Sequence, residues 1–442
     1  MIKKNNILKS PGGMRSYLPE VATELKNIEN DIMDVFELWG YQPIKTPTLE
    51  YFESLTEGMG RTLDKKLYKF IDYEGNILAL RPEMTAPIAR TLSTRLNEVE
   101  LPLRLSYNAS VFRYDQPQTG KNREIYQLGV EFIGEKNYLA DAETIILAIE
   151  SLQNTGIKDF KIDVGHAAFL NGIIKELKLD EYIEYELKSF LNKKDLVGLN
   201  NYIEDLDIPD KKVLKRIPLL RGGLEILEDA GLLVNNPDSN QALENLRKIY
   251  SYLDSYGFAD YITFDLGLSR GFDYYTGVVF EGFTEKLGYT ICGGGRYDNL
   301  LRKFSGIKIP AIGFAIGIER VRLALKRQKY GFKKYTIDEY IIFNEGTEEL
   351  ALSTAKKMRS RGLVTVVTAA FEQSAEQVNK KEKSNKTAIA ETKETGSILA
   401  KKGLKRILSF LSPEELEIHD LVDNSKEIIS LDQDWEETLW EI

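Results

Sequence analysis

Apolar residues recur at three- and four-residue steps near the start of the chain, and this spacing predicts an amphipathic helix. The repeating positions are Leu25, Ile28, Ile32, Val35, Phe36 and Trp39. Gly40 is expected to end the helix, because glycine readily adopts the backbone conformation of a helix C-terminus. The next segment, 41–49, contains Pro43 and Pro47 and is therefore expected to be extended.

Alternating polar and apolar positions then predict two antiparallel hairpins. One joins 66–72 to 77–80, and the second spans 103–134 with a loop at 116–123. A helix from Glu83 to about Leu96 is expected between them. The later expected elements are strands at 158–164, 262–266, 274–283, 288–292 and 311–316, and helices at 141–153 and 317–328.

Leucine and isoleucine at helical spacing, without a strong strand, predict a helical insertion over about 167–255. Because the strands before and after it form hairpins rather than alternating with helices, residues 1–328 are expected to form an α+β domain. A run of three glycines at 293–295 lacks the G-x-G-x-x-G spacing of a dinucleotide site, so that interpretation is rejected.

The pattern changes after residue 328. A strand at 339–343, a helix at 347–361 and a strand at 363–368 predict a β-α-β unit with a right-handed crossover. We therefore expect 329–442 to be a smaller α/β region. Its segment 372–403 is rich in lysine and other polar residues, which favours a loosely ordered stretch.

Composition narrows the class of protein. The chain has 442 residues, of which 43% are hydrophobic and 29% charged, as in ordinary globular proteins. No apolar stretch is long enough to span a membrane, and the N-terminus lacks the apolar core of a secretory signal, so a cytoplasmic location is expected. One cysteine and two histidines argue against an internal disulfide, a zinc site or a Cys-His nucleophile, and neither metal nor cofactor is expected.

The charge balance bears on the partners of the protein. Asp and Glu number 68 against 59 Lys and Arg, which gives a net charge of −9. Proteins that bind nucleic acid usually carry a basic excess, because phosphate neutralisation supplies much of their affinity. The acidic balance therefore weighs mildly against RNA as the main partner.

Three arginines are candidates for recognising an oxyanion. Arg113 follows an apolar strand, Arg270 precedes two tyrosines, and Arg320 begins a predicted helix. A guanidinium can hold a phosphate or carboxylate with two parallel hydrogen bonds. The alternative is that each arginine pairs with a local carboxylate and only stabilises the fold.

A second group of candidates lies on one predicted strand. Gln127, Gly129 and Glu131 are two residues apart, so they share one face of the sheet, and Gly129 is expected to leave room there for a ligand. A buried amide and carboxylate need polar partners, which a bound zwitterion would supply. The alternative is a face exposed to solvent.

Other polar residues have both a structural and a functional interpretation. Glu83 and Thr85 could accept hydrogen bonds from an ammonium group, or could cap the helix that begins there. Tyr274 and Tyr275 are adjacent on an expected strand, so at most one of them should face a pocket. His166 is interpreted as a structural residue at a strand end, and Cys292 as inert core.

Five segments in order resemble the catalytic core of class II aminoacyl-tRNA synthetases, specifically the histidyl enzyme, over about residues 10–328. YQPIKTPTLE is similar to the dimer-forming first motif, VFRYDQPQTGKNREIYQLGVEFIG to the second and AIGFAIGIER to the third. LGLSRGFDYYTG and GGGRYDNL are similar to the two histidine-specific segments. The resemblance implies an antiparallel sheet flanked by helices, with Arg113 and Arg320 at the positions that contact ATP phosphates.

The same resemblance implies a histidine pocket. Glu83, Thr85 and Gln127 would hold the α-ammonium, Glu131 and Tyr274 would meet the imidazole, and Arg270 would lie on the carboxylate side. Arg113 and Tyr275 complete the set of expected histidine-binding residues.

Departures from the synthetase pattern point to a paralogous family. Met84 in RPEMTAPIAR stands where the synthetase pattern has glycine. This segment, with GHAAFLNG, LNKKDLVGL and LRGGLEIL, resembles the regulatory subunits of ATP phosphoribosyltransferase. Beyond residue 329, the lysine-rich segment departs from the usual anticodon-binding domain.

The regulatory family implies a particular role. It implies a non-catalytic protein that binds a short phosphoribosyltransferase, is required for the first step of histidine biosynthesis and brings inhibition by L-histidine. It also implies a homodimeric core within a hetero-oligomer. Two alternatives remain: a histidyl-tRNA synthetase, which would activate histidine with ATP, and a stand-alone amino-acid sensor, which would have no phosphoribosyltransferase partner.

Overall fold

The computed structural model describes residues 8–59, 66–114, 122–208, 210–268, 274–284, 287–288, 290–370 and 404–431, and Trp435. The chain forms two compact units: the first comprises Met1–Leu18 and Leu25–Gly331, and the second comprises Pro19–Glu24 and Phe332–Ile442. Within these described residues, no helix is both long and apolar enough to cross a bilayer.

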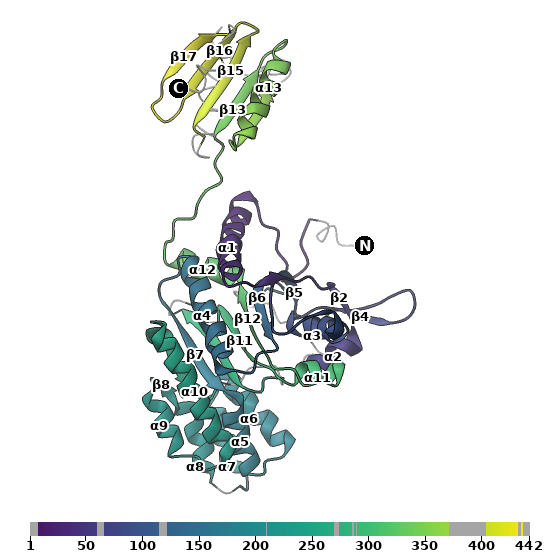
Figure 1. Cartoon of the computed structure of the whole chain (residues 1–442), viewed down its shortest axis with the longest axis vertical. Coiled ribbons are helices and arrows are strands. Elements are labelled where there is room, and N and C mark those ends of the chain that lie inside the picture. Colours follow the sequence, from purple (N-terminus) through teal and green to yellow (C-terminus); the bar gives the residue numbers. More distant parts are fainter. Residues whose placement is uncertain are drawn as a thin grey trace. The chain divides into compact units, whose positions relative to one another are not determined.

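A nine-stranded sheet is the centre of the first unit (Figure 1). The strand order is β1-β5-β6-β12-β11-β10-β7-β9-β8, and all pairs are antiparallel except β1 with β5 and β7 with β9. The strands are β1 (Gln42–Pro43), β5 (Leu103–Phe112), β6 (Glu124–Ile133), β7 (Phe160–His166), β8 (Arg221–Gly222), β9 (Ile262–Asp265), β10 (Val278–Thr284), β11 (Cys292–Arg296) and β12 (Ala311–Gly317). The predicted hairpin over 103–134 is confirmed as β5 and β6.

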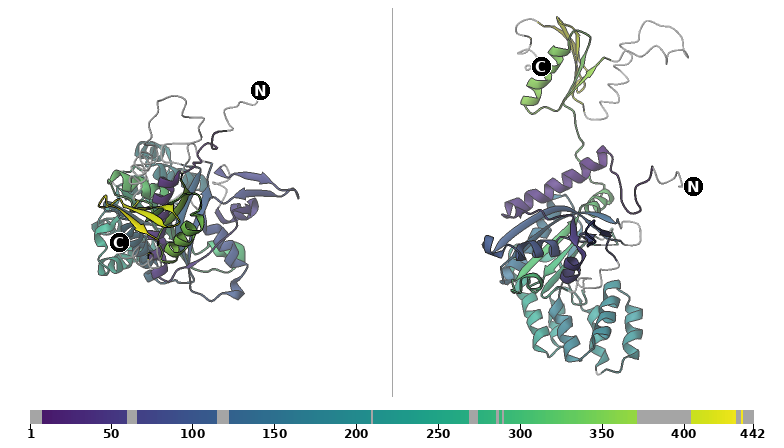
Figure 2. Two further views of the ribbon diagram at one scale, coloured as in Figure 1. Left: turned by 90° about the horizontal axis from the view of Figure 1, so that it is seen from above. Right: turned by 90° about the vertical axis from the view of Figure 1, so that its right-hand side faces the viewer.

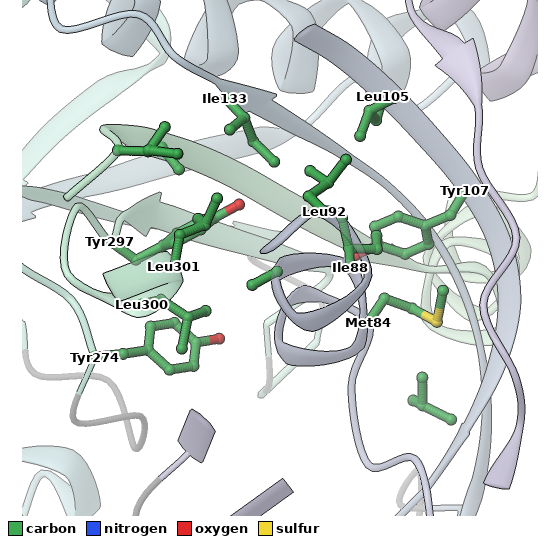
Figure 3. Packing of buried hydrophobic residues seen from close by; sticks show 14 residues of the cluster. Met84, Ile88, Leu92, Leu105, Tyr107, Ile133, Tyr274, Tyr297, Leu300 and Leu301 are labelled. Carbon is green, nitrogen blue, oxygen red and sulfur yellow. The ribbon is translucent and has the colours of Figure 1, made fainter. Parts of the chain in front are cut away.

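Different helices pack on the two faces of this sheet. They are α1 (Pro19–Leu38), α3 (Thr85–Ser93), α4 (Tyr138–Asn154), α11 (Leu300–Ser305) and α12 (Ile318–Arg327), whereas α2 (Phe52–Met59) packs on a separate, smaller sheet. The predicted apolar face of α1 packs on the sheet, where the rings of Phe36 and Phe314 meet edge to face. On the opposite face, α3 and α11 form an apolar cluster with Leu105 and Tyr107 of β5 (Figure 3).

The helical insertion is confirmed between β7 and β9. It comprises α5 (Ala167–Glu176), α6 (Glu181–Lys193), α7 (Leu196–Asp205), α8 (Lys211–Arg216), α9 (Glu225–Gly231) and α10 (Pro237–Ser255). Figure 2 shows it at the end of the first unit that lies away from α1. The insertion also contains β8, a two-residue strand that pairs with β9 and that the sequence pattern does not predict.

A separate three-stranded sheet contains the first predicted hairpin. Its order is β2-β4-β3, with β2 (Leu49–Tyr51), β3 (Lys69–Ile71) and β4 (Ile77–Leu80). The predicted turn follows β3, where the Asp72 carboxylate accepts hydrogen bonds from the backbone of Glu74 and Asn76. One face of this sheet packs on α2, where Ala79 joins Leu55 and Met59 in a small core.

Two strand predictions near the end of the first unit need correction. The strand expected at 288–292 is displaced, because β11 runs from Cys292 to Arg296 and includes all three glycines. The strand expected from residue 274 begins only at Val278, so Tyr274 and Tyr275 precede it. The bounds of β11 follow from its hydrogen-bonded neighbours, because it pairs with β10 and β12 along its glycines.

The second unit contains a five-stranded sheet of order β14-β13-β15-β16-β17. Its elements are β13 (Glu339–Phe343), α13 (Glu348–Ser360), β14 (Thr365–Ala369), β15 (Arg406–Ser412), β16 (Glu415–Asp420) and β17 (Lys426–Ser430). The predicted β-α-β unit is present, because β13 and β14 are parallel and α13 connects them. The lysine-rich segment 372–403 lies outside the described residues.

Candidate functional site

A floor of small residues underlies the cavity of the first unit. On β6, Gln127, Gly129 and Glu131 share a face, and the register places them opposite Gly317, Ala315 and Gly313 of β12. Gly293 and Gly295 of β11 continue the same face. Because all of these residues except Gln127, Glu131 and Ala315 are glycines, polar groups from neighbouring elements can lie close to the sheet. Of the glycine run that carries no dinucleotide motif, Gly293 and Gly294 line a cavity.

The cavity above this floor has a volume of about 230 Å³. It is lined by residues of β5, β6, β11, β12, α3 and α12 and by the two tyrosines before β10. The polar side chains at its wall are Glu83, Thr85, Tyr107, Arg113, Gln127, Tyr274, Tyr275, Thr290, Tyr297 and Arg320. Most of the residues that the sequence predicts for one pocket therefore do lie together. Arg270 is outside the described residues.

Gly129 does not leave the open space expected from the sequence. A Cβ atom at this position would lie 2.3 Å from the Tyr107 hydroxyl oxygen and 2.4 Å from the Phe314 carbonyl oxygen. The side chain of Tyr107, which is opposite Gly129 on β5, occupies the room that the glycine provides. The prediction of ligand space directly above Gly129 is therefore wrong, because a neighbouring strand fills it.

Glu83 caps α3 and also borders the cavity. Its carboxylate accepts hydrogen bonds from the backbone N–H groups of Thr85 and Ala86, at 2.7 and 2.8 Å. Burial raises the pKa of Glu83, while these donors and the charge of Arg113 oppose the rise. The capping role that the sequence allowed for either residue thus belongs to Glu83, and the Thr85 hydroxyl donates to the Glu131 carboxyl.

Glu131 lies behind two residues of the cavity wall. Its carboxyl accepts hydrogen bonds from the Thr85 hydroxyl, at 2.8 Å, and from the Tyr297 hydroxyl, and only 1% of the residue is exposed. Burial raises the pKa of Glu131 to about 8, against these two hydrogen bonds. Any interaction of Glu131 with a ligand in the cavity would therefore be transmitted by Thr85 or Tyr297.

Two arginines supply positive charge at the cavity wall. Arg113 Nε donates to the Pro82 carbonyl oxygen at 2.8 Å. Arg320 donates to the carbonyl oxygen and the hydroxyl of Thr290, at 2.6 and 3.1 Å. These bonds help to hold the two guanidinium groups at the cavity wall. The cavity thus combines two arginines with the Glu83 carboxyl.

Both tyrosines of the pair at 274–275 face the cavity. Their ring centroids are 4.9 Å apart, and both residues line the cavity wall. The expectation that only one could do so is wrong, because it assumed a strand, and the strand begins three residues after Tyr275. Tyr274 also packs against Tyr297 and belongs to the apolar cluster around α3 and α11 (Figure 3).

Several wall residues were not predicted from the sequence. Tyr107, Tyr297 and Thr290 lie on the wall with Cys292, which the sequence assigns to the core and which is indeed buried. Tyr297 could have been found, because it is two and four residues from Gly295 and Gly293 in an alternating pattern. Tyr107 and Thr290 carry no such signal. Among the described residues, no group of three His, Cys, Asp or Glu could hold a metal ion.

Comparison with known proteins agrees with this fold. The histidyl-tRNA synthetase family model matches residues 13–321. A curated relative from Halothermothrix orenii, named ATP phosphoribosyltransferase regulatory subunit, is 56% identical over 358 residues, which are 81% of this chain and 86% of the relative. A relative of the same name from Acetivibrio thermocellus is 34% identical over 414 residues, 93% of this chain and 94% of the relative.

Solved structures of related proteins match the chain in fold. A crystal structure from Bacillus halodurans C, described as an ATP phosphoribosyltransferase regulatory subunit/histidyl-tRNA synthetase, has a TM-score of 0.75 and 37% identity, and the match covers 84% of this chain and 95% of that one. Histidyl-tRNA synthetase from Nostoc also has a TM-score of 0.75, over 98% and 99% of the chains, but its 21% identity supports the fold alone. The chain belongs to the family of ATP phosphoribosyltransferase regulatory subunits, non-catalytic proteins built on the fold of histidyl-tRNA synthetase.

Proposed function

We propose that this chain activates a short-form ATP phosphoribosyltransferase catalytic subunit in the first step of histidine biosynthesis, and that it makes that enzyme sensitive to L-histidine. The two proteins would form a hetero-oligomer in the cytoplasm. The core over 1–328 would form one domain and carry the histidine site, and residues 329–442 would form a second domain. Family membership supports the partner, and the cavity supports the effector.

The observation that carries the proposal for histidine is the placement of opposite charges in one small cavity. The Glu83 carboxyl and the Gln127 amide suit an α-ammonium group, and Arg113 suits a carboxylate. The tyrosine hydroxyls offer donors and acceptors to an imidazole. Arg320 lines the same cavity, and the resemblance to the synthetase would place ATP phosphates beside it. An amino acid is therefore the class of ligand that matches the residues lining the cavity.

Reconstitution tests this function. Mixing the chain with the short phosphoribosyltransferase from the same genome is expected to produce ATP-dependent phosphoribosyl transfer that histidine inhibits. Absence of activation by an intact partner would contradict the proposal. In that case, histidine-dependent exchange of pyrophosphate into ATP by this chain alone would support the synthetase.

A cavity variant connects inhibition to this site. Gln127→Met keeps the length of the side chain but removes the amide, so about tenfold more histidine should be needed for half-inhibition, with activation retained. Asn108→Met is the matched control, because Asn108 is on the neighbouring strand opposite Leu128, on the other face of the sheet. Equal inhibition of both variants would show that inhibitory histidine binds elsewhere.

We also propose that the chain forms a homodimer through the exposed face of the three-stranded sheet. The register places Leu49, Tyr51, Phe70, Leu78 and Leu80 on this face, opposite the face that packs on α2. Leu49, Tyr51 and Phe70 are 45%, 55% and 47% exposed. An apolar face without a charged side chain is typical of a protein interface. Leu49 lies in YQPIKTPTLE, the segment that resembles the dimer-forming motif.

Phe70→Glu is expected to weaken the dimer by at least about a hundredfold, because a carboxylate would be buried in an apolar interface. Ile71→Glu is the matched control: Ile71 is also exposed, but it pairs with Ile77 and points to the opposite face. Sedimentation velocity at micromolar concentration measures the change. A monomeric wild-type chain, or equal effects of both variants, would contradict this interface.

A further inference from the structure

A groove between α5 and α10 lies apart from the cavity described above. Its volume is about 330 Å³, its rim carries Lys175 and Asp238, and His166 and Asn245 form its floor with Thr276. Thr276 follows the two cavity tyrosines directly, so the segment from Tyr274 to Thr276 separates the groove from the cavity. None of the proposed roles of the chain uses this groove.

The groove forms where the two helices diverge after a close approach. At Gly172 of α5, a Cβ atom would lie 2.5 Å from the Asn236 Oδ1 and Ser239 Oγ atoms at the start of α10. Ser239 Oγ donates to the Phe169 carbonyl oxygen at 2.8 Å, which fixes this approach. Beyond this contact the two helices leave an opening with polar walls between them.

The imidazole of His166 presents a hydrogen-bond donor to the groove. His166 is 7% exposed, and its Nδ1 accepts a hydrogen bond from the backbone N–H of Ala168 at 3.2 Å. Burial, with a smaller contribution from the charge of Arg296, lowers the pKa of His166 to about 4, so the ring is neutral at pH 7. Because Nδ1 is an acceptor, the single ring proton must be on Nε2.

Asn245 places a second donor beside the first. Its Oδ1 accepts a hydrogen bond from Gln241 Nε2 at 2.9 Å, which turns its Nδ2 toward His166 Nε2 at 3.5 Å. Two N–H groups that face each other cannot satisfy one another. An acceptor oxygen in the groove beside them could accept a hydrogen bond from both.

We propose that this groove is a second ligand site, which binds the carboxylate group of a small metabolite. One carboxylate can accept from both His166 Nε2 and Asn245 Nδ2, and Lys175 at the rim adds a favourable charge. Lys175 Nζ is 3.1 Å from Asp238 Oδ2, so the rim also offers an anion. A simple organic acid would use the donors alone, whereas a free amino acid would also place its ammonium group near Asp238.

The histidine content of the chain provides a direct readout. Only two histidines are present, His166 in the groove and His419 on β16 of the other unit. In the full chain labelled with ¹⁵N-histidine, acetate and glycine should each shift the His166 Nε2–H signal saturably, while His419 stays fixed. Sodium chloride at equal concentration should not do so. Tighter binding of glycine would indicate an amino acid, and equal binding a simple carboxylic acid.

Three variants test whether the shift arises from binding in the groove. Asn245→Leu should weaken the effect at least about tenfold, because it removes one of two donors. Asn240→Leu is the matched control, since Asn240 is an exposed asparagine of the same helix outside the groove. Gln127→Met, which alters the cavity, should leave the shift unchanged.

Two results would overturn the proposal. If His166 shows no saturable shift with either probe, no carboxylate binds beside it. The ring proton is then hydrogen-bonded to water, or the amides of Gln241 and Asn245 have the reversed orientation. If Asn245→Leu binds as tightly as the wild type, the carboxylate does not bind in this groove.

Discussion

Replacing Arg296 with methionine is expected to lower the free energy of unfolding by about 3–5 kcal/mol. Arg296 is 7% exposed, and its Nε donates to Asp141 Oδ1 at 2.7 Å, while its Nη1 donates to Asp298 and to the Glu135 carbonyl oxygen. Removal of the guanidinium would leave the buried Asp141 without its counter-charge. Urea unfolding of the two proteins measures the difference.

The loss of unfolding free energy in Arg296→Met should increase with pH. Burial raises the pKa of Asp141 to about 6 although Arg296 opposes the rise, and without Arg296 this pKa should increase further. The folded variant would then hold a proton that the unfolded chain has lost, so its stability decreases as pH rises. The deficit relative to wild type should therefore be larger at pH 8 than at pH 5.

Arg95→Met is the matched control for Arg296→Met. Arg95 makes an exposed ion pair with Glu98 at 3.8 Å, and such pairs contribute about 0–1 kcal/mol. A loss for Arg296→Met that is no larger than that for Arg95→Met would mean that the buried pair contributes little to folding.

Replacing Glu131 with glutamine is expected to remove a large part of the pH dependence of stability. Burial raises the pKa of Glu131 from 4.5 to about 8. The folded state therefore retains a proton that the unfolded state loses, and wild-type stability should fall by about 3–5 kcal/mol as pH rises from 4.5 to 8. Glutamine resembles the protonated acid, so the variant should be more stable than wild type at pH 8 and similar to it at pH 4.5.

The measurement is the free energy of unfolding between pH 5 and 8.5 for wild type and variant. Glu228→Gln, an exposed position on α9, is the control and should leave the wild-type slope unchanged. Parallel pH profiles of Glu131→Gln and wild type would show that Glu131 is ionised in the folded protein over this range.

The local spacing of hydrophobic and polar residues determines many of the helices and strands of this protein. The hairpin of β5 and β6, the helical face of α1 and the β-α-β start of the second unit all follow from spacing within a few residues, because side-chain periodicity is a local property of helices and strands. The same periodicity placed Gln127 and Glu131 on one face. The ordered motifs indicate the family without any tertiary contact.

Only the tertiary structure decided how these side chains are used. Tyr107 fills the space above Gly129, and Tyr297 and Thr85 separate Glu131 from the cavity. Arg296 finds its partner 155 residues away in Asp141, and the groove depends on the approach of α5 to α10. Periodicity fixes which face a residue occupies, but which distant segment packs against that face depends on the shapes and charges of both, and local spacing carries no information about the second segment.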